Sequence, residues 1–295
     1  MSGNTDVVLY DHPGPRAKTR NAVLTVVFGL GLLALAYWIY VKFDEKGQWA
    51  AALWKPFLEG STWTDYILPG LGHTLAAAAV AMVLSLIFGI LFAVGRLSDH
   101  WWISYPAGAV VEFFRAVPLL LLIFFTFFGI PFITQQPMSI FWALVIGLTL
   151  YNGSVLAEAF RAGIRSVPSG QSEAGYAIGM RKSQVMKEIL VPQAARAMLP
   201  VIVSQLVVLL KDTALGYIIS YPELIQYGVN NVAANFGNVV QAAIVVAVIF
   251  IVVNSALTSL AGWLERRTRR SGRAPRAATA APGVTDTGEA ATATL

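Results

Sequence analysis

The stretch AVLTVVFGLGLLALAYWIYV, residues 22–41, is uncharged and apolar on every face of a helix. At about 1.5 Å per residue, a helix of this length crosses a hydrocarbon core of about 30 Å. A strand would cross with about 10 residues of alternating polarity, so the uniform pattern excludes a barrel. The whole chain agrees, because 56% of its 295 residues are hydrophobic and only 13% are charged, against about 25% charged in soluble domains. The sequence predicts an all-α integral membrane protein.

Five more blocks of similar length and polarity come later in the chain, so the sequence predicts six transmembrane helices. The first block is too long for a signal peptide and lacks a small-residue cleavage site, which indicates a retained helix. The predicted spans are Ala22–Val41, Leu71–Gly95, Ala107–Ile130, Ile140–Phe160, Val201–Ser220 and Val239–Gly262.

The distribution of basic residues predicts the orientation. With both termini in the cytoplasm, 16 of the 21 Lys and Arg residues lie inside and 3 lie outside, as the positive-inside rule requires. This asymmetry accounts for the net charge of +5 without a nucleic-acid partner. The predicted organisation is a basic cytoplasmic tail (1–21), an extra helix (22–41), an extracytoplasmic loop (42–70), a helical core (71–262) with a cytoplasmic loop (161–200), and a disordered cytoplasmic tail (263–295).

The cytoplasmic loop contains two short amphipathic segments. After Pro168, a helix with Ala174, Ala177 and Ile178 on one side is expected to end at a left-handed Gly179. Ser183 is the expected cap of a second helix, and Pro192 and Pro200 are expected to bound the segment after that helix. From spacing alone, the pair is equally consistent with a docking knob and with interfacial helices that lie on lipid headgroups.

The same loop resembles the EAA loop of ATP-binding-cassette importer permeases. The resemblance is carried by Glu173, Ala174 and Gly179, with ILVP at residues 189–192, and Gly175 stands where that family has its second alanine. The resemblance implies a coupling helix that docks into a cytoplasmic ATPase subunit. The implied coupling residues are Ser172, Glu173, Ala174, Gly175, Ala177, Gly179, Met180 and Arg181.

Further segments extend the resemblance over residues 69–262. They are GLGHTLAAAAVAM from residue 70, EFFRAVPLLLLIFFTFFGIP at 112–131, LAEAFRAGIRSVPSGQSEA at 156–174 and LLKDTALGYIISYPEL at 209–224. The second and last of these resemble the polar amino-acid subfamily, whose core has five helices. The segment at 22–41 is then an added first helix, as in actinobacterial glutamate permeases.

The resemblance also implies partners. These are two copies of an ATPase, a second permease that is expected to differ from this one, and an extracytoplasmic solute-binding protein, all working on an amino-acid substrate such as glutamate, glutamine or aspartate. The sequence has no Gly-Lys pair and hence no P-loop, so ATP and Mg²⁺ are expected on the partner ATPase and no cofactor on this chain. Arg181, Lys182 and Lys187 are candidates to meet acidic groups of the ATPase, or are simply solvated cations.

Charged residues inside the predicted spans are candidates for the substrate pathway. Lys211 and Asp212 would each cost about 2.5–3.5 kcal/mol if they faced lipid, so they must face protein or water. A cation and an anion suit the two ends of an amino-acid zwitterion. The other interpretation is a structural pair held by Glu158, Arg115 or a second subunit. The candidate pathway residues are Lys211, Asp212, Thr213, Glu158, Arg115 and Glu112, with Arg161 beside them near the cytoplasmic end.

Catalytic functions are disfavoured by the residue inventory. The chain has no cysteine and only three histidines, none at the spacing of a zinc protease, so neither catalytic nor metal-ligating residues are predicted. The alternative of another class is a self-contained secondary transporter with Lys211, Asp212 and Glu158 as a proton or ion relay. It predicts inverted repeats, and none is evident in the sequence.

Overall fold

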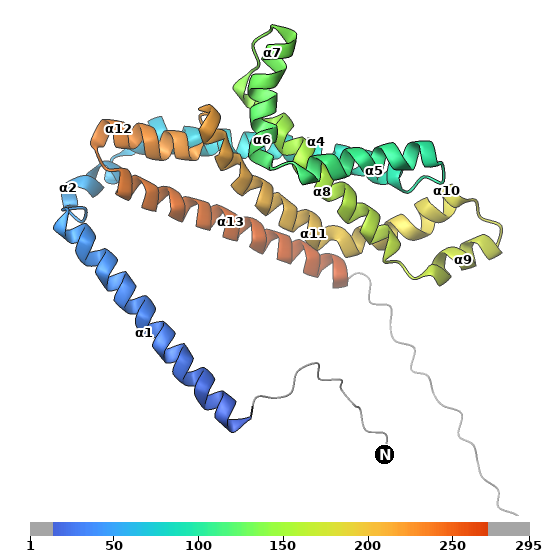
Figure 1. Ribbon diagram of the computed structural model, residues 1–295, viewed down its shortest axis with the longest axis horizontal. Coiled ribbons are helices and arrows are strands. Elements are labelled where there is room, and N and C mark those ends of the chain that lie inside the picture. Colours follow the sequence, from blue (N-terminus) through green and yellow to red (C-terminus); the bar gives the residue numbers. More distant parts are fainter. Residues whose placement is uncertain (1–13, 271–295) are drawn as a thin grey trace, which may run out of the picture. The chain divides into compact units, whose positions relative to one another are not determined.

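A computed structural model describes residues 14–270. It divides into two units, which are described one at a time: residues 14–76 with 214–250, and residues 77–213 with 251–270. The ribbon is helical wherever the structure describes regular structure (Figure 1). Five helices are long and apolar enough to cross a membrane, or six if one bent pair counts as a span.

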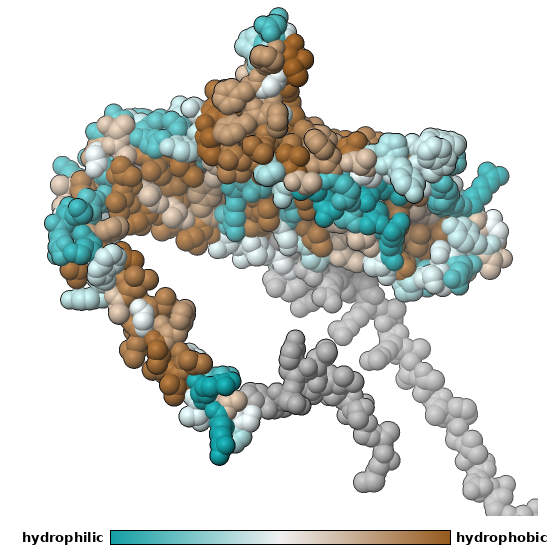
Figure 2. Space-filling model, in the orientation of Figure 1, coloured by the Kyte–Doolittle hydropathy of each residue, from teal (hydrophilic) through white to brown (hydrophobic). Residues whose placement is uncertain are grey.

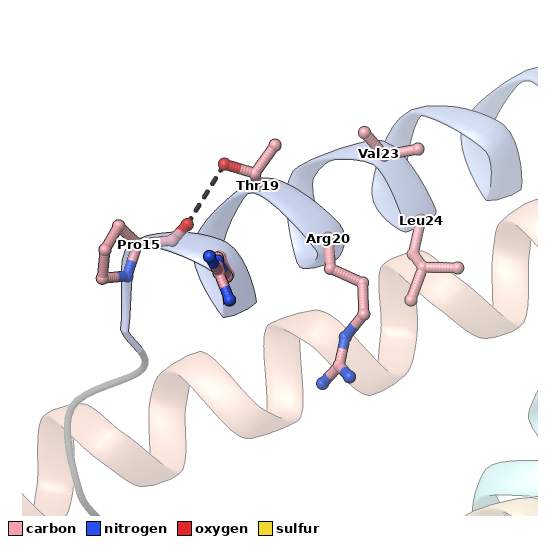
Figure 3. Close-up of a pocket in the computed structure, with 6 residues that line it drawn as sticks. Pro15, Thr19, Arg20, Val23 and Leu24 are labelled. Atoms are coloured by element: carbon pink, nitrogen blue, oxygen red, sulfur yellow. Dashed lines mark hydrogen bonds between the residues drawn. The ribbon is translucent and has the colours of Figure 1, made fainter.

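The first unit begins with α1 (Pro15–Glu45), whose side chains are mostly exposed and none of which is buried. Figure 2 shows hydrophobic residues along most of α1 and hydrophilic ones at its N-terminal end. A helix that is apolar on all faces cannot present this surface to water, so the structure agrees with a lipid-facing first helix. The hollow in Figure 3 is lined by successive turns of α1 alone, where Thr19 Oγ1 donates to the Pro15 carbonyl at 3.1 Å.

Short elements come after α1 and form the core of the first unit. They are α2 (Ala51–Trp54), η1 (Lys55–Leu58), α3 (Gly60–Thr62), η2 (Trp63–Ile67), the first turns of α4 (Leu68–Arg96), η5 (Thr213–Ile219), η6 (Gln226–Asn231), α12 (Val232–Phe236) and the start of α13 (Val239–Arg270). Within this unit, one cluster of buried apolar side chains is made of Phe57, Ile67, Leu224, Val232, Ala242 and Val246.

Polar side chains close this first unit over long sequence distances. Asn238 Nδ2 donates to the Leu53 carbonyl at 3.0 Å, and the Gln241 amide donates to the Gln48 carbonyl. These bonds fasten the segment after α1 to the start of α13. They also give the two side-chain NH₂ groups a partner, without which their burial would be costly.

The second unit contains the rest of α4, α5 (Trp101–Ala116), α6 (Leu119–Phe124), η3 (Phe125–Gly129), α7 (Ile130–Thr134) and α8 (Ile140–Arg165). The loop and fifth span form α9 (Ser169–Ala177), α10 (Lys182–Gln184), η4 (Val185–Leu190) and α11 (Val191–Asp212). α8 is the central helix, since more than half of its apolar window is buried and it packs against α5, α6 and α11.

The predicted third span, Ala107–Ile130, is wrong as one continuous helix. The chain is helical from Trp101 to Ala116 and again from Leu119 to Thr134, with a bend of 101° between the two. Pro118 causes the break, because it lacks an N–H and forces the preceding residue away from helical angles. Val117 is accordingly extended, at φ −80° and ψ 129°.

The prediction that Pro192 and Pro200 bound separate segments is also wrong. Helical structure runs from Lys182 to Ile219 through both prolines. The wide π-type turns of η4, Val185–Leu190, end two residues before Pro192, and local adjustment of this kind lets a helix accommodate proline. The last helix differs too, because α13 continues to Arg270, into the tail expected to be disordered, while residues 271–295 lie outside the described part.

Candidate functional site

An ion-pair cluster joins the end of α4 to α5 and α8. Glu158 Oε2 lies 2.7 Å from Arg96 Nη1 and 3.9 Å from Arg115 Nη1, and the Arg161 guanidinium donates to the same carboxylate. Glu112 Oε1 extends the cluster to Arg96 Nη2 at 3.2 Å and to Arg115 Nη1 at 3.8 Å. Four of these five residues were singled out from the sequence. Arg96 was missed, although its basic side chain at the end of an apolar span was a usable signal.

The central members of this cluster are only slightly exposed. The side chains of Arg96 and Glu158 are 13% and 24% accessible. Charges removed from water to this extent require partners. Each one therefore holds the others in place, and the cluster sets how the ends of three helices meet.

A second polar site lies where α8 meets α11. The Asp212 carboxyl is half-buried and hydrogen-bonded to the Asn152 side chain. The Gln205 amide donates to Asn152 Oδ1, and Asn152 Nδ2 donates to the Leu148 carbonyl at 3.1 Å. Asn152 and Gln205 were not predicted, although each is a polar residue within an apolar span.

Lys211 and Thr213 flank Asp212 but have different surroundings. Lys211 is exposed, and Thr213 is buried with its hydroxyl donating to the Leu210 carbonyl at 2.6 Å. Within residues 14–270, neither Lys211 nor Asp212 joins an ion pair. The interpretation in which this pair is fastened to Glu158 or Arg115 therefore has no counterpart in the described chain. Asp212 instead forms a polar cluster with two amides.

The loop between α8 and α11 forms a compact projection. α9 ends with Gly179 at φ 85°, the left-handed conformation expected from the sequence. The next helix begins at Lys182, where the Gln184 side chain accepts a hydrogen bond from the Arg181 N–H at 2.8 Å. Arg181, and not Ser183, is therefore the capping position.

The buried side of α9 is not the predicted one. Ala174, Ala177 and Ile178 are exposed, and Gly175 is the buried residue of this helix. A Cβ on Gly175 would lie 2.9 Å from Ile189 Cδ1, closer than real Cβ contacts allow. The close approach of the two helices accounts for glycine at this position.

The exposed surface of α9 contains both an acidic and an apolar part. Glu173 is exposed, the side chain of Tyr176 is 48% exposed, and that of Ile178 is 80% exposed at the turn. Ser172 is half-buried and donates to the Ser169 carbonyl at 2.8 Å, and Met180 is half-buried beside Gly175. This surface is available to a partner.

Lys182 ties the projection to the connection between α4 and α5. Its Nζ donates to the Leu97 carbonyl at 3.2 Å and forms an ion pair with Asp99. Lys182 therefore has an acidic partner within this chain, whereas its contact with an acid of the ATPase stays a prediction. Arg181 and Lys187 differ, since Arg181 is exposed and neither joins an ion pair within the described residues.

The first unit contains a buried carboxyl that sequence reasoning did not identify. Glu223 is fully buried and accepts hydrogen bonds from the N–H groups of Ile225 and Gln226 at 2.8 and 2.7 Å. Burial raises the pKa of Glu223 to about 7, against the lowering effect of these hydrogen bonds. The signal was an acidic residue directly before a helix, which is a capping position.

Tyr221 and Thr74 complete this buried region. The Tyr221 hydroxyl donates to the His73 carbonyl at 3.0 Å, and burial raises the pKa of Tyr221 to about 12. Thr74 Oγ1 accepts from the Leu224 N–H at 3.0 Å. Within the described residues, no three acidic or histidine side chains gather as a metal site.

Long apolar helices, a bent pair among them, together with a projecting loop that is charged at its base, are the features of a helical membrane protein with a docking projection. The model of the family "binding-protein-dependent transport system inner membrane component" matches residues 85–270. The chain therefore belongs to this family and is a membrane permease subunit of an ATP-binding-cassette importer for amino acids, not an enzyme.

Two curated relatives show the subfamily. The chain is 45% identical over 231 residues to the glutamate transport system permease protein GluD of Corynebacterium glutamicum, covering 78% of this chain and 84% of the relative. It is 35% identical to the probable glutamine ABC transporter permease protein GlnP of Bacillus subtilis, covering 68% and 93%. The resemblance to polar amino-acid permeases is thus confirmed.

Two solved structures show the fold. An amino acid ABC transporter with histidines aligns with a TM-score of 0.67 at 26% identity, over 72% of this chain and 98% of that one. The MetNI methionine ABC transporter in inward-facing form aligns with a TM-score of 0.57 at 18% identity, over 70% and 96%. The second match supports the fold alone.

Proposed function

We propose that this permease imports an acidic or amide amino acid, with glutamate first, and that it forms half of the translocation pathway. The single observation that carries the substrate is the 45% identity to a permease whose name specifies glutamate. A second permease of different sequence, two ATPase copies and a solute-binding protein complete the assembly. ATP and Mg²⁺ belong to the ATPase, and no cofactor belongs to this chain.

The proposed orientation places both termini and the α9 projection in the cytoplasm, in keeping with the basic residues of the termini and the loop. The projection is then the coupling element. Its exposed face, with Glu173, Tyr176 and Ile178, offers an acidic and an apolar contact to an ATPase groove. The projection is held in place by the packing of Gly175 and by the Lys182–Asp99 ion pair. Motion of the ATPase is therefore transmitted to α8 and α11.

The proposed pathway contains the polar site of α8 and α11. Asp212 supplies an anion for the substrate ammonium, while Lys211 supplies a cation for a carboxylate. The Asn152 side chain bonds to the Asp212 carboxyl, and the Gln205 amide in turn holds Asn152 in position. The ion cluster around Glu158 lies nearer the cytoplasmic end and belongs to the gate, where pairs must break when the pathway opens.

A self-contained secondary transporter receives no support from these findings. The chain matches a binding-protein-dependent family over residues 85–270, and such systems use a separate solute-binding protein. The charged residues at the ends of α4, α5 and α8 pair with one another in the ion cluster, so their presence does not require a proton relay.

The test is uptake by the reconstituted full complex. Proteoliposomes with the permeases and ATPase, supplied with binding protein and internal ATP, are expected to accumulate labelled glutamate. Glu173→Lys should abolish both uptake and retention of the ATPase during purification. Glu59→Lys is the matched control, since Glu59 is also exposed but lies in the predicted extracytoplasmic connection. ATP-dependent uptake of sugars without any amino acid would overturn the proposal.

A further inference from the structure

An open apolar groove of about 690 Å³ lies between α4, α8 and α11 of the second unit. Each helix contributes residues spaced three or four apart, so the groove follows one face of each helix. Among the side chains that line it are Ile90, Val94, Phe160, Ile164, Met198 and Ile202.

The groove is separate from the polar sites described above. On α8, Phe160 lies two residues after Glu158, which places the two side chains about 200° apart around the helix. Phe160 and Ile164 line the groove, whereas Glu158, the centre of the ion cluster, points away from it. The groove is therefore not the polar route assigned to substrate.

One end of the groove is ionic and the other is apolar. Lys182 and Asp99, the ion pair at the base of the projection, line the ionic end. Their side chains remain 42% and 72% accessible, so both can meet a further group. The apolar end lies at Leu86, and the 11 residues from there to Leu97 correspond to about 16 Å of helix, close to half of a hydrocarbon core of about 30 Å.

Aromatic residues mark the depth of the ionic end. Trp101, Trp102 and Tyr105 begin α5 directly after this end and are 70%, 60% and 75% exposed. Exposed Trp and Tyr are enriched at the boundary between hydrocarbon and headgroups. The ionic end thus lies at headgroup level, and the groove runs from there to about the middle of the membrane.

We propose that the groove is a binding site for one aminophospholipid, phosphatidylethanolamine, of the leaflet on that side. One acyl chain lies along the apolar walls, the phosphate meets Lys182 Nζ, and the ammonium meets the Asp99 carboxylate. A cation and an anion side by side match a zwitterionic headgroup, whereas an anionic lipid such as phosphatidylglycerol would face Asp99 without compensation.

The shape and lining of the groove suit a lipid chain. Its walls are mainly apolar over about 16 Å of helix, which one extended acyl chain can follow, while the charged pair at one end can meet a headgroup. In the proposed orientation the lipid belongs to the cytoplasmic leaflet and touches both the projection and α11.

The experiment measures lipids retained by the full complex in mild detergent, using native mass spectrometry after addition of palmitoyl-oleoyl phosphatidylethanolamine or phosphatidylglycerol. Ala195→Trp fills the groove from α11, where Ala195 is exposed and lines it. It is expected to lower retention of phosphatidylethanolamine at least tenfold. Lys182→Gln is expected to lower it about fivefold. Val94→Trp fills the same groove from α4, so the result does not depend on one variant folding.

Ala197→Trp is the matched control, because Ala197 is exposed on the same helix and does not line the groove. It should retain the lipid within twofold of the wild type. Equal retention in Ala195→Trp and Ala197→Trp, or equal retention of the two lipids by the wild type, would overturn the proposal.

Ala195→Cys provides an independent check, since the natural chain contains no thiol. Cross-linking of this thiol to a thiol-reactive phosphatidylethanolamine is expected. Cross-linking to the second permease instead would show a protein occupant and contradict the proposal. Lipid binding requires only membrane insertion, so a failure of amino-acid uptake would leave this result unaffected.

Discussion

Gly175 of α9 packs so closely against Ile189 of η4 that a single methyl group on the glycine would lie 2.9 Å from the Ile189 Cδ1 atom and equally near Val185 Cγ2. Two helices of the projection thus meet at a point where a side chain on α9 would require Ile189 and Val185 to move. Gly175 lets the two helices approach without that rearrangement.

Gly175→Ala is therefore expected to distort the projection, at a cost of about 1–3 kcal/mol for overpacking. ATP-dependent uptake should fall at least fivefold, and less ATPase should copurify. Gly170→Ala is the matched control, because a Cβ on Gly170 of the same helix meets no atom within 4 Å. Adding Ile189→Val and Val185→Ala removes the two clashing atoms and should restore ATPase binding. Full activity of Gly175→Ala alone would show that Ile189 and Val185 move aside at little cost in free energy.

Arg96→Met is expected to destabilise the second unit because it removes the nearer of the two arginines that the Glu158 and Glu112 carboxylates share. Because these side chains retain some solvent contact, the expected cost is about 1–3 kcal/mol, below that of a fully buried pair. Thermal unfolding in detergent measures it. Arg115→Met should cost less, since Arg115 lies 3.9 Å from Glu158 against 2.7 Å for Arg96. Additive effects of Arg96→Met and Glu158→Gln would contradict direct coupling.

Asp212→Asn keeps the shape of the side chain and removes its charge. If Asp212 meets the substrate ammonium, losing a charged hydrogen bond worth about 1.5–3 kcal/mol should reduce kcat/KM for glutamate uptake by about tenfold or more. Basal ATPase activity of the complex should stay within twofold. Ser204→Ala, a polar change on the same helix at an exposed position, is the control. Unchanged uptake by Asp212→Asn would remove Asp212 from the pathway.

Glu223 is expected to make stability depend on pH. Its pKa is about 7 in the folded protein against an ordinary value of 4.5, so between these values the native state binds more protons than the unfolded state. Stability therefore falls as pH rises through this window, by at most about 3 kcal/mol. Glu223→Gln should flatten the dependence of Tm on pH between 5 and 8, and Glu59→Gln, at an exposed position, should not. An unchanged slope in Glu223→Gln would show that Glu223 is already ionised at pH 5.

The site was partly predictable for a simple reason. Glu158, Asp212 and Lys211 stand out because charges within apolar spans are costly and must be accommodated. Asn152 and Gln205 are neutral, so their cost is smaller and their pairing depends on how α8 and α11 pack. The ion pair of Lys182 could not be predicted either, because its partner Asp99 lies 83 residues away in the sequence.

By itself, the sequence determined that the chain is helical, lies in a membrane and belongs with importer permeases. Those properties depend on hydropathy, helix length and local motifs, which act over a few turns of chain. Only the tertiary structure decided that Pro118 breaks the third span while Pro192 and Pro200 do not break the fifth. It also decided that α9 buries Gly175 rather than its alanines. The physical reason is that proline tolerance and the choice of buried face depend on neighbouring helices that are distant in sequence.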